Sequence, residues 1–281
     1  MATFSIICGG RACQMSCPFC ISKMTNACTD NEHSELNEGK LHKAFAYVER
    51  LGVSTVLITG RGEPTLYFEK LLRIVELANE YNMIVELQTN GVAPYLEWTE
   101  NEQIWQLQYA GLDTIAISLA SLDRAINNNI MRCSTSFDVT GVVAKLSKFF
   151  TTRVTYMLSR LNGPEIKTSQ WFVEQIMAAQ ILGAKQITFR TIGTSAECNN
   201  KKVVDWINKY ADKQNYSWCF DEIGTNLWDF DWNGRVYDVS GMSVCISDCL
   251  DDRVEIKQPR SFIFDGQHLR YSWQYKGALI F

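Results

Sequence analysis

The sequence lacks a long apolar run and an excess of basic charge. No stretch approaches the roughly 20 consecutive apolar residues that span a bilayer, so we expect no membrane partner. A net charge of −4 gives no basic field for nucleic acid, and Lys201-Lys202 does not extend into a basic stripe. No basic and apolar signal segment precedes residue 13, so we expect a cytoplasmic protein. In that compartment, ten cysteines indicate metal or redox chemistry rather than disulfides.

Short apolar runs alternate with helix-spaced apolar residues as far as residue 190. With 46% hydrophobic and 21% charged residues, the chain has a globular composition with enough apolar residues for a large core. Leu41, Ala44 and Val48 are typical of the helical spacing between strands. Six strand–helix pairs predict an α/β fold, a parallel sheet in a partial (β/α)6 TIM-like barrel. The predicted strands are 4–8, 54–59, 84–87, 114–119, 153–158 and 186–190.

The last part of the chain has a different amino-acid composition and no strand–helix alternation. Residues 216–281 are rich in Trp, Tyr, Phe and Asp, and Asn233-Gly234 between apolar flanks predicts a hairpin. Residues 261–273 predict a second hairpin. We therefore predict a barrel core of residues 1–195 and a mainly β C-terminal extension of residues 196–281. The extension would close the barrel and hold an auxiliary cluster or the substrate.

Three cysteines, Cys13, Cys17 and Cys20, stand in a CxxxCxxC spacing just after the first predicted strand. Three thiolates can hold an iron–sulfur cube and leave its fourth iron without a protein ligand, whereas four cysteines would close it. The open iron is a position where chemistry can occur. A zinc site is the alternative, and it would need a fourth ligand such as His33.

A second motif, Gly60-Arg61-Gly62-Glu63-Pro64, ends the second predicted strand. Together with the cysteine spacing and the aromatic Phe19, this motif resembles the radical S-adenosylmethionine (radical SAM) superfamily over about residues 4–192. The resemblance implies that the three cysteines bind a [4Fe–4S] cluster. Its open iron would bind the amino acid end of S-adenosylmethionine, beside Phe19.

The resemblance also gives the second motif a role. Backbone oxygens at Arg61 and Gly62, with the Glu63 carboxylate, would hold the ammonium of S-adenosylmethionine, because a cation needs acceptors and glycine lets the backbone come close. Arg61 departs from the family pattern, in which a glycine is common at that position. A close backbone approach at residue 61 is therefore left open.

Further cosubstrate contacts are implied at the ends of later strands. Each of these residues is also typical of helix caps and turns, so a cosubstrate contact and a purely structural role both stay open. The residues are Asn90 in Thr89-Asn90-Gly91, Ser118 with Ser121 and Asp123 behind it, Ser159, and Arg190.

The resemblance implies an enzyme that cleaves S-adenosylmethionine reductively to methionine and a 5′-deoxyadenosyl radical. That radical would take hydrogen from a small polar metabolite, for oxidation, epimerisation or rearrangement. The implied partner is an electron donor such as flavodoxin or ferredoxin. The acidic and aromatic run at residues 228–232 favours a cationic substrate and is equally typical of a half-buried edge strand. A sugar-like or nucleotide-like substrate is also compatible with the sequence.

Cys249 is the candidate catalytic residue of the extension. With Cys245, and with Cys219 or Cys198, it would hold a second iron–sulfur cluster. Alternatively, its thiol would return a hydrogen atom to a product radical. A buried, inert cysteine is the third interpretation.

Other classes of protein remain open. A peptide-modifying radical SAM enzyme is one, although the few residues before Cys13 lead us to expect no peptide-binding domain there. A glycyl-radical activase is another, and the long extension argues against it. A non-catalytic iron–sulfur or zinc protein would differ from all of these in leaving S-adenosylmethionine intact.

Overall fold

The computed structural model describes residues 3–24, 35–195, 198–230, 234–248, 260–273, 275 and 277–281. The chain forms two compact units. The first comprises Met1–Gln14, Ile21–Ile115 and Glu255–Phe281, and the second Met15–Cys20 and Ala116–Val254. The domains expected at residues 1–195 and 196–281 stay a prediction. Within the described residues, no helix is both long and apolar enough to cross a bilayer.

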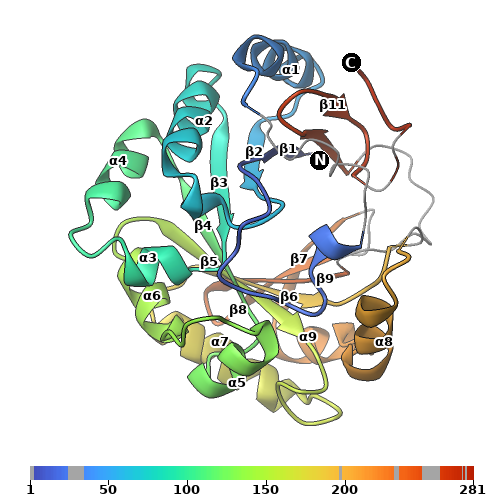
Figure 1. Cartoon of the computed structure of the whole chain (residues 1–281). Coiled ribbons are helices and arrows are strands. Elements are labelled where there is room, and N and C mark those ends of the chain that lie inside the picture. Colours follow the sequence, from blue (N-terminus) through green and yellow to red (C-terminus); the bar gives the residue numbers. More distant parts are fainter. Residues whose placement is uncertain are drawn as a thin grey trace. The chain divides into compact units, whose positions relative to one another are not determined.

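The first unit contains the beginning and the end of the chain (Figure 1). Its elements are β1 (Thr3–Ile7), η1 (Ile21–Lys23), α1 (Glu38–Arg50), β2 (Thr55–Thr59), η2 (Pro64–Leu66), α2 (Phe68–Glu80), β3 (Ile84–Thr89), α3 (Val92–Leu96), α4 (Glu102–Ala110), β10 (Ser261–Phe264) and β11 (Leu269–Arg270). Strand β4 (Thr114–Leu119) begins in this unit and ends in the second.

The sheet of the first unit has the strand order β11-β10-β1-β2-β3, and only β11 is antiparallel to its neighbour there. Strand β10 pairs with β1 in parallel, with Thr3 opposite Ser261. One face of each strand is buried against helices, and the ring of Phe4 lies 5.2 Å from that of Phe45 in α1. The alternate residues face the other way, as the period of two in a strand requires. The antiparallel β10–β11 pair confirms the second predicted hairpin.

The second unit continues the alternation of strands and helices. Its elements are α5 (Arg124–Met131), α6 (Val139–Leu146), β5 (Thr151–Leu158), α7 (Ser169–Ile181), β6 (Gln186–Thr191), α8 (Lys201–Tyr210), α9 (Ser217–Ile223), β7 (Thr225–Phe230), β8 (Gly234–Val239) and β9 (Met242–Asp248). The strand order is β5-β6-β9-β8-β7, with β9 parallel to β6. The antiparallel β7–β8 pair confirms the first predicted hairpin, and its turn at residues 231–233 lies outside the described residues.

Aromatic rings fill the core between α7, α9 and the strands of the second unit. The ring of Phe172 lies 5.0 Å from that of Phe189 and 4.7 Å from that of Phe220, and Tyr156 lies 5.6 Å from Phe189. Such pairs add to the free energy of burial when the rings meet edge-on or tilted. This α/β fold, with parallel strands alternating with helices and further strands after β6, confirms the predicted class: a partial TIM-like barrel with C-terminal strands.

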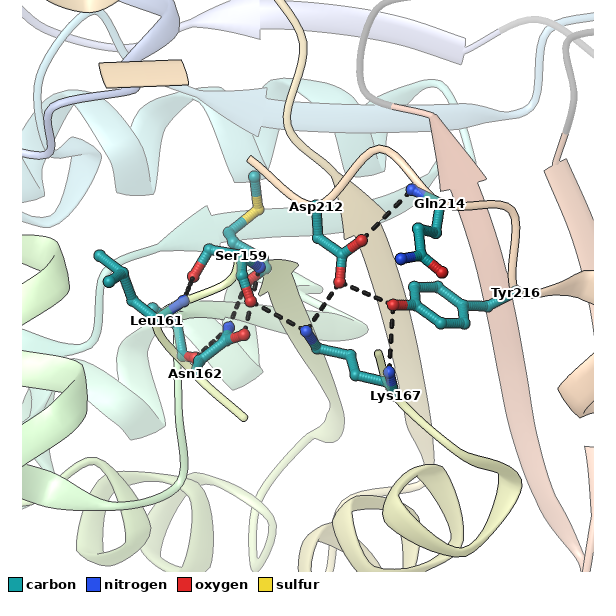
Figure 2. A network of polar contacts seen from close by, with 9 residues as sticks. Ser159, Leu161, Asn162, Lys167, Asp212, Gln214 and Tyr216 are labelled. Carbon is teal, nitrogen blue, oxygen red and sulfur yellow. Dashed lines mark hydrogen bonds and ion pairs between the residues drawn. The ribbon is translucent and has the colours of Figure 1, made fainter. Parts of the chain in front are cut away.

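A buried ion pair fixes the loop after β5 (Figure 2). The Lys167 ammonium lies 2.8 Å from Asp212 Oδ2, and the two side chains are 0% and 2% exposed. Lys167 Nζ also donates to the Ser159 carbonyl at 2.9 Å, and the Tyr216 hydroxyl donates to Asp212 at 2.9 Å. Burial lowers the pKa of Lys167, while Asp212 acts in the opposite direction. The Lys167 ammonium is thus neutralised by Asp212 and also binds the Ser159 carbonyl, while Tyr216 donates to the same carboxylate.

The same loop holds the end of α8. The Arg160 amide donates to the carbonyl of Tyr210, the last residue of α8, at 2.8 Å. The Asn162 side chain donates to the carbonyls of Met157 and Ala120 at 2.6 Å each. The carboxyl ends of β4 and β5 are therefore tied to α8 by hydrogen bonds that do not depend on solvent.

We expect Lys167→Met to destabilise the protein by about 3–5 kcal/mol, because it leaves the Asp212 carboxylate buried without its cation. Urea denaturation monitored by circular dichroism measures the change. Lys185→Met, at an exposed lysine before β6, should change stability by at most about 0.5 kcal/mol. A loss below about 1 kcal/mol in Lys167→Met would show that the ion pair does not hold this loop.

Candidate active site

The Glu63 carboxylate joins the ends of β2 and β3. It is 3% exposed and lies in the Gly60–Pro64 loop that follows β2. Its Oε1 accepts from Thr89 Oγ1 at 2.6 Å, from Thr65 Oγ1 at 2.7 Å and from the Thr65 amide at 3.2 Å. Its Oε2 accepts from the Asn90 amide at 2.9 Å. Burial raises the pKa of Glu63, and these hydrogen bonds oppose the rise because they favour the charged form.

Gly62 lets the loop after β2 touch the loop after β1. A Cβ at residue 62 would lie 2.1 Å from the Ala12 carbonyl oxygen, and the Glu63 amide donates to that oxygen at 2.9 Å. Only glycine fits such an approach without displacing backbone. The close approach thus falls at residue 62, so the side chain of Arg61 next to it is tolerated.

Asn90 connects the Glu63 carboxylate to the cysteine loop. Its amide binds Glu63, and its side-chain Nδ2 lies 3.5 Å from Cys13 Sγ and 3.3 Å from Gln14 Oε1. Its Oδ1 accepts from the Val92 amide at 2.9 Å at the start of α3, which fixes the orientation of the amide group. Within the first unit, the two sequence motifs therefore meet at Asn90, and Cys13 itself is exposed.

The second half of the cysteine loop belongs to the second unit. Cys17 and Cys20 are half-buried, and the Cys20 amide donates to the Cys17 carbonyl at 3.3 Å. Cys17 Sγ lies 3.9 Å from Met131 Sδ at the end of α5. The buried ring of Phe19 packs on Trp206 of α8 at 5.1 Å. Phe19 is therefore held by α8.

The donor set of the loop fits an iron–sulfur cluster. Cys13, Cys17 and Cys20 are exposed or half-buried and are not joined in disulfides, and soft thiolates favour iron–sulfur clusters over hard cations. The described residues contain no group of three or more His, Cys, Asp or Glu arranged to hold a metal ion, and Cys13 lies in a different unit from Cys17 and Cys20. The alternative zinc ligand His33 lies outside the described residues.

The other predicted cosubstrate contacts in the second unit lie at or near the carboxyl ends of β4, β5 and β6, which are neighbours in the sheet. Ser118 is half-buried in β4, and Arg190 is half-buried near the end of β6, opposite Met157 and Ser247. The fully buried Ser159 accepts from the Leu161 amide at 3.2 Å, which is the hydrogen bond of a turn. Their roles toward the cosubstrate stay predictions.

The C-terminal cysteines lie in different surroundings. Cys249 lies outside the described residues. Cys245 is half-buried in β9, in register with Thr188 of β6. Cys219 is 0% exposed in α9, and burial raises the pKa of its thiol, so this cysteine fits the structural interpretation.

Sequence reasoning missed the partners of the predicted residues. Thr65 and Thr89 bind Glu63, and Trp206 and Met131 contact the cysteine loop. Thr89 stands in the Thr-Asn-Gly turn, and Thr65 follows the second motif directly. Their nearness to the motifs was therefore the one sequence signal that they contact Glu63. Nothing in the local sequence connects Trp206 to residue 19, because that contact depends on the fold.

A cavity of about 210 Å³ opens on the strand faces of the first unit. Its lining mixes apolar side chains with hydroxyls, and Arg61 is the one charged residue in the lining that the structure describes. The lining residues are Ser5, Ile7, Ile21, Ser22, Leu57, Thr59, Gly60, Arg61, Gln88, Ser261, Ile263 and Trp273. The second motif, through Gly60 and Arg61, therefore forms part of the wall of a ligand-sized space.

Residues 7–168 match the family model described as the radical SAM superfamily. This match covers more than half of the chain and includes both motifs, so the chain belongs to the radical SAM superfamily. The expected resemblance is thereby confirmed. Arg190 and α8 lie beyond the matched residues.

Curated relatives are similar over part of their length. A "Probable GTP 3',8-cyclase" of Methanopyrus kandleri is 31% identical over 186 residues, which are 65% of this chain and 54% of the relative. Another of Pyrococcus horikoshii is 29% identical over 140 residues, 50% of this chain and 41% of the relative. The chain thus spans about half the length of the curated relatives that it matches.

Solved structures share the fold. SuiB of Streptococcus suis bound to the precursor peptide SuiA superposes with a TM-score of 0.58 at 14% identity, over 97% of this chain and 60% of SuiB. Methylornithine synthase (PylB) gives a TM-score of 0.52 at 12% identity, over 76% of this chain and 58% of PylB. At these identities the likeness shows the fold alone.

We expect Gly62→Ala to destabilise the protein by about 1–3 kcal/mol, because its methyl group would force the loops after β1 and β2 apart. Urea denaturation measures the loss. Gly39→Ala in α1 is the matched control, since its Cβ would meet no atom closer than 3.7 Å. That change should be neutral or stabilise by up to about 1 kcal/mol. Equal stability of the two variants would contradict the close contact.

Proposed function

We propose that this protein is an enzyme that holds a [4Fe–4S] cluster on Cys13, Cys17 and Cys20 and cleaves S-adenosylmethionine reductively. When bound, the cluster supplies the electron for this cleavage, and the resulting 5′-deoxyadenosyl radical takes a hydrogen atom from a small metabolite. The observation that carries the proposal is the family match over both motifs, together with the contact of Asn90 with Cys13 and with Glu63. An electron donor such as flavodoxin or ferredoxin would complete the system.

The residues of the first unit would bind and orient the cosubstrate. Asn90 donates toward Cys13 Sγ, and such a hydrogen bond stabilises a thiolate and tunes a cluster. Glu63 and the carbonyl oxygens of the Gly60–Gly62 turn offer acceptors to an ammonium group. Phe19, Ser118, Ser159 and Arg190 are proposed as further contacts with the cosubstrate. The buried Glu63 carboxylate also accepts from the Asn90 amide, and Cys13, Cys17 and Cys20 remain the proposed cluster ligands when Glu63 is replaced.

The substrate is proposed to enter the cavity beside Arg61. The Arg61 guanidinium lines this cavity, and a guanidinium is a donor group that can bind carboxylate or phosphate oxygens of a ligand. At about 210 Å³ the cavity is smaller than the roughly 300–1,000 Å³ of typical ligand pockets. It would therefore enclose a small metabolite, or only part of a nucleotide such as the one in the relatives' names. Cys249 is proposed to act later in turnover, as a second-cluster ligand or a hydrogen-atom donor.

The cluster assignment predicts that Cys13→Ala, Cys17→Ala and Cys20→Ala each abolish cleavage of S-adenosylmethionine, because each removes one of three ligands. The measurement is methionine and 5′-deoxyadenosine formed by reconstituted protein with dithionite. Cys133→Ser is the control, because its half-buried thiol donates to the Thr135 carbonyl and is not a proposed ligand, although the Cys133 backbone pairs with Met15 of the cysteine loop. Wild-type cleavage by any of the three alanine variants would refute the assignment.

The proposed role of Glu63 predicts that Glu63→Gln weakens binding of S-adenosylmethionine about tenfold or more, with iron content unchanged. The side-chain amide of Gln would place an NH₂ donor against groups that are themselves hydrogen-bond donors. The lost charge-assisted hydrogen bond to the ammonium would contribute on the order of 1.5–3 kcal/mol to binding. Equilibrium binding to the reconstituted protein measures the effect. The exposed Glu97→Gln should bind as the wild type does. Unchanged affinity in Glu63→Gln would leave Glu63 with a structural role only.

A further inference from the structure

Helix α8 and its surroundings present a basic face on an acidic protein. Four exposed lysines belong to α8 or follow it directly, and the exposed Arg160 binds the end of α8 through its amide. Lys213 donates to Asn208 of α8 at 3.4 Å, and Lys209 lies over the ring of Tyr210 at 5.1 Å. On α8 itself, Asp205 is the one carboxylate. The basic face consists of Arg160, Lys201, Lys202, Lys209 and Lys213.

The sequence alone does not show these residues near one helix. Lys201-Lys202 has no basic neighbours in the chain, but the fold brings Lys209, Lys213 and Arg160 to the same helix. Lys202 and Lys209 are seven residues apart, so they lie on one side of α8. The net charge of −4 for the whole chain therefore conceals a local positive surface.

The same helix touches the loop that carries Cys17 and Cys20. Trp206 packs on Phe19 at 5.1 Å and on Tyr210 at 5.4 Å. Phe19 is buried, whereas Trp206 and Tyr210 are half-exposed. Three aromatic rings in contact, those of Phe19, Trp206 and Tyr210, therefore connect the cysteine loop with the exposed side of α8.

The helix dipole does not explain the lysines of the first turn of α8. Lys201 and Lys202 occupy that turn, where the dipole favours acidic residues and disfavours cations. Lys209, in the last turn, is favoured by the dipole. The helix is nevertheless rigidly placed, because the buried Lys167–Asp212 pair fixes the segment that follows it (Figure 2). A fixed surface with unfavourable charge is what a docking site for an acidic partner requires.

We propose that the basic face of α8 docks an acidic one-electron carrier protein, which delivers its electron to the cysteine loop beside Phe19 and Trp206. This inference rests on the proposed function, because each reductive cleavage consumes one electron. The carrier is oxidised by one electron and the cluster is reduced by one, so no further reactant is needed. A nucleic acid is the other polyanion that a basic surface could bind. The contact with the cysteine loop favours the electron carrier.

The test is the double charge reversal Lys202→Glu/Lys209→Glu in the full-length, reconstituted protein. Cleavage of S-adenosylmethionine is driven either by an acidic flavodoxin or by dithionite, which is small and needs no docking surface. We expect the apparent KM for flavodoxin to rise on the order of tenfold or more at low ionic strength. Dithionite-driven cleavage should stay at the wild-type rate. Added salt should slow the flavodoxin-driven reaction of the wild type and leave that of the variant nearly unchanged.

The matched control is Lys148→Glu/Lys185→Glu, which makes the same change in net charge at exposed lysines before β5 and β6. It should keep the wild-type KM for flavodoxin. An unchanged KM in Lys202→Glu/Lys209→Glu, or an equal loss in the control, would overturn the proposal. Equal losses with both reductants would overturn it as well, because docking affects only the carrier.

Direct binding separates this inference from the proposed function. Titration calorimetry with oxidised flavodoxin needs no turnover, so it tests the basic face even if the protein fails to cleave S-adenosylmethionine. Wild-type binding that the double reversal abolishes supports the docking site. Tighter binding of a single-stranded 20-mer oligonucleotide than of flavodoxin, lost in the same variant, would assign the face to nucleic acid instead.

Discussion

The loops of the first unit depend on one buried carboxylate. Glu63 accepts four hydrogen bonds from the chain itself, and these bonds fix the ends of β2 and β3 relative to each other. A buried carboxylate needs a hydrogen-bond donor for each of its oxygens. The groups that donate to Glu63 are therefore fixed in position together with it. Asn90 is one of those donors, and its side chain reaches Cys13. The second motif thus shapes the surroundings of the first cysteine through ordinary hydrogen bonding, before any cofactor is considered.

The second unit uses a buried cation for a similar purpose. The Lys167–Asp212 pair adds little net stability, since desolvation offsets much of its attraction, but it allows only one arrangement of the groups around it. That arrangement ties the loop after β5 to the end of α8. Helix α8 in turn holds Phe19, which stands between two cysteines in the chain. Both halves of the cysteine loop are therefore supported by polar networks some distance from the thiols.

The fold class and the two motifs could be predicted because their signals are local. Apolar periods of two and of 3.6 residues identified β1 to β6 and the helices between them except the short α3 and α5, and CxxxCxxC is contained in eight residues. Long-range pairings carried no such signal. The return of β10 to β1, the contact of Asn90 with Cys13 and the hydrogen bond of the Arg160 amide to the Tyr210 carbonyl each join residues far apart in the sequence. Such pairings follow from topology, which composition and spacing do not specify.

The pairing of β10 with β1 affects how the protein is made. Thr3 is synthesised 258 residues before its partner Ser261. At roughly 5–20 residues per second, β1 waits tens of seconds with one edge unpaired. An unpaired strand edge can associate with other chains, and pairing across so long a separation in the sequence is slow. Nascent chains of this protein should therefore be most prone to aggregation, and most dependent on chaperones, until β10 emerges.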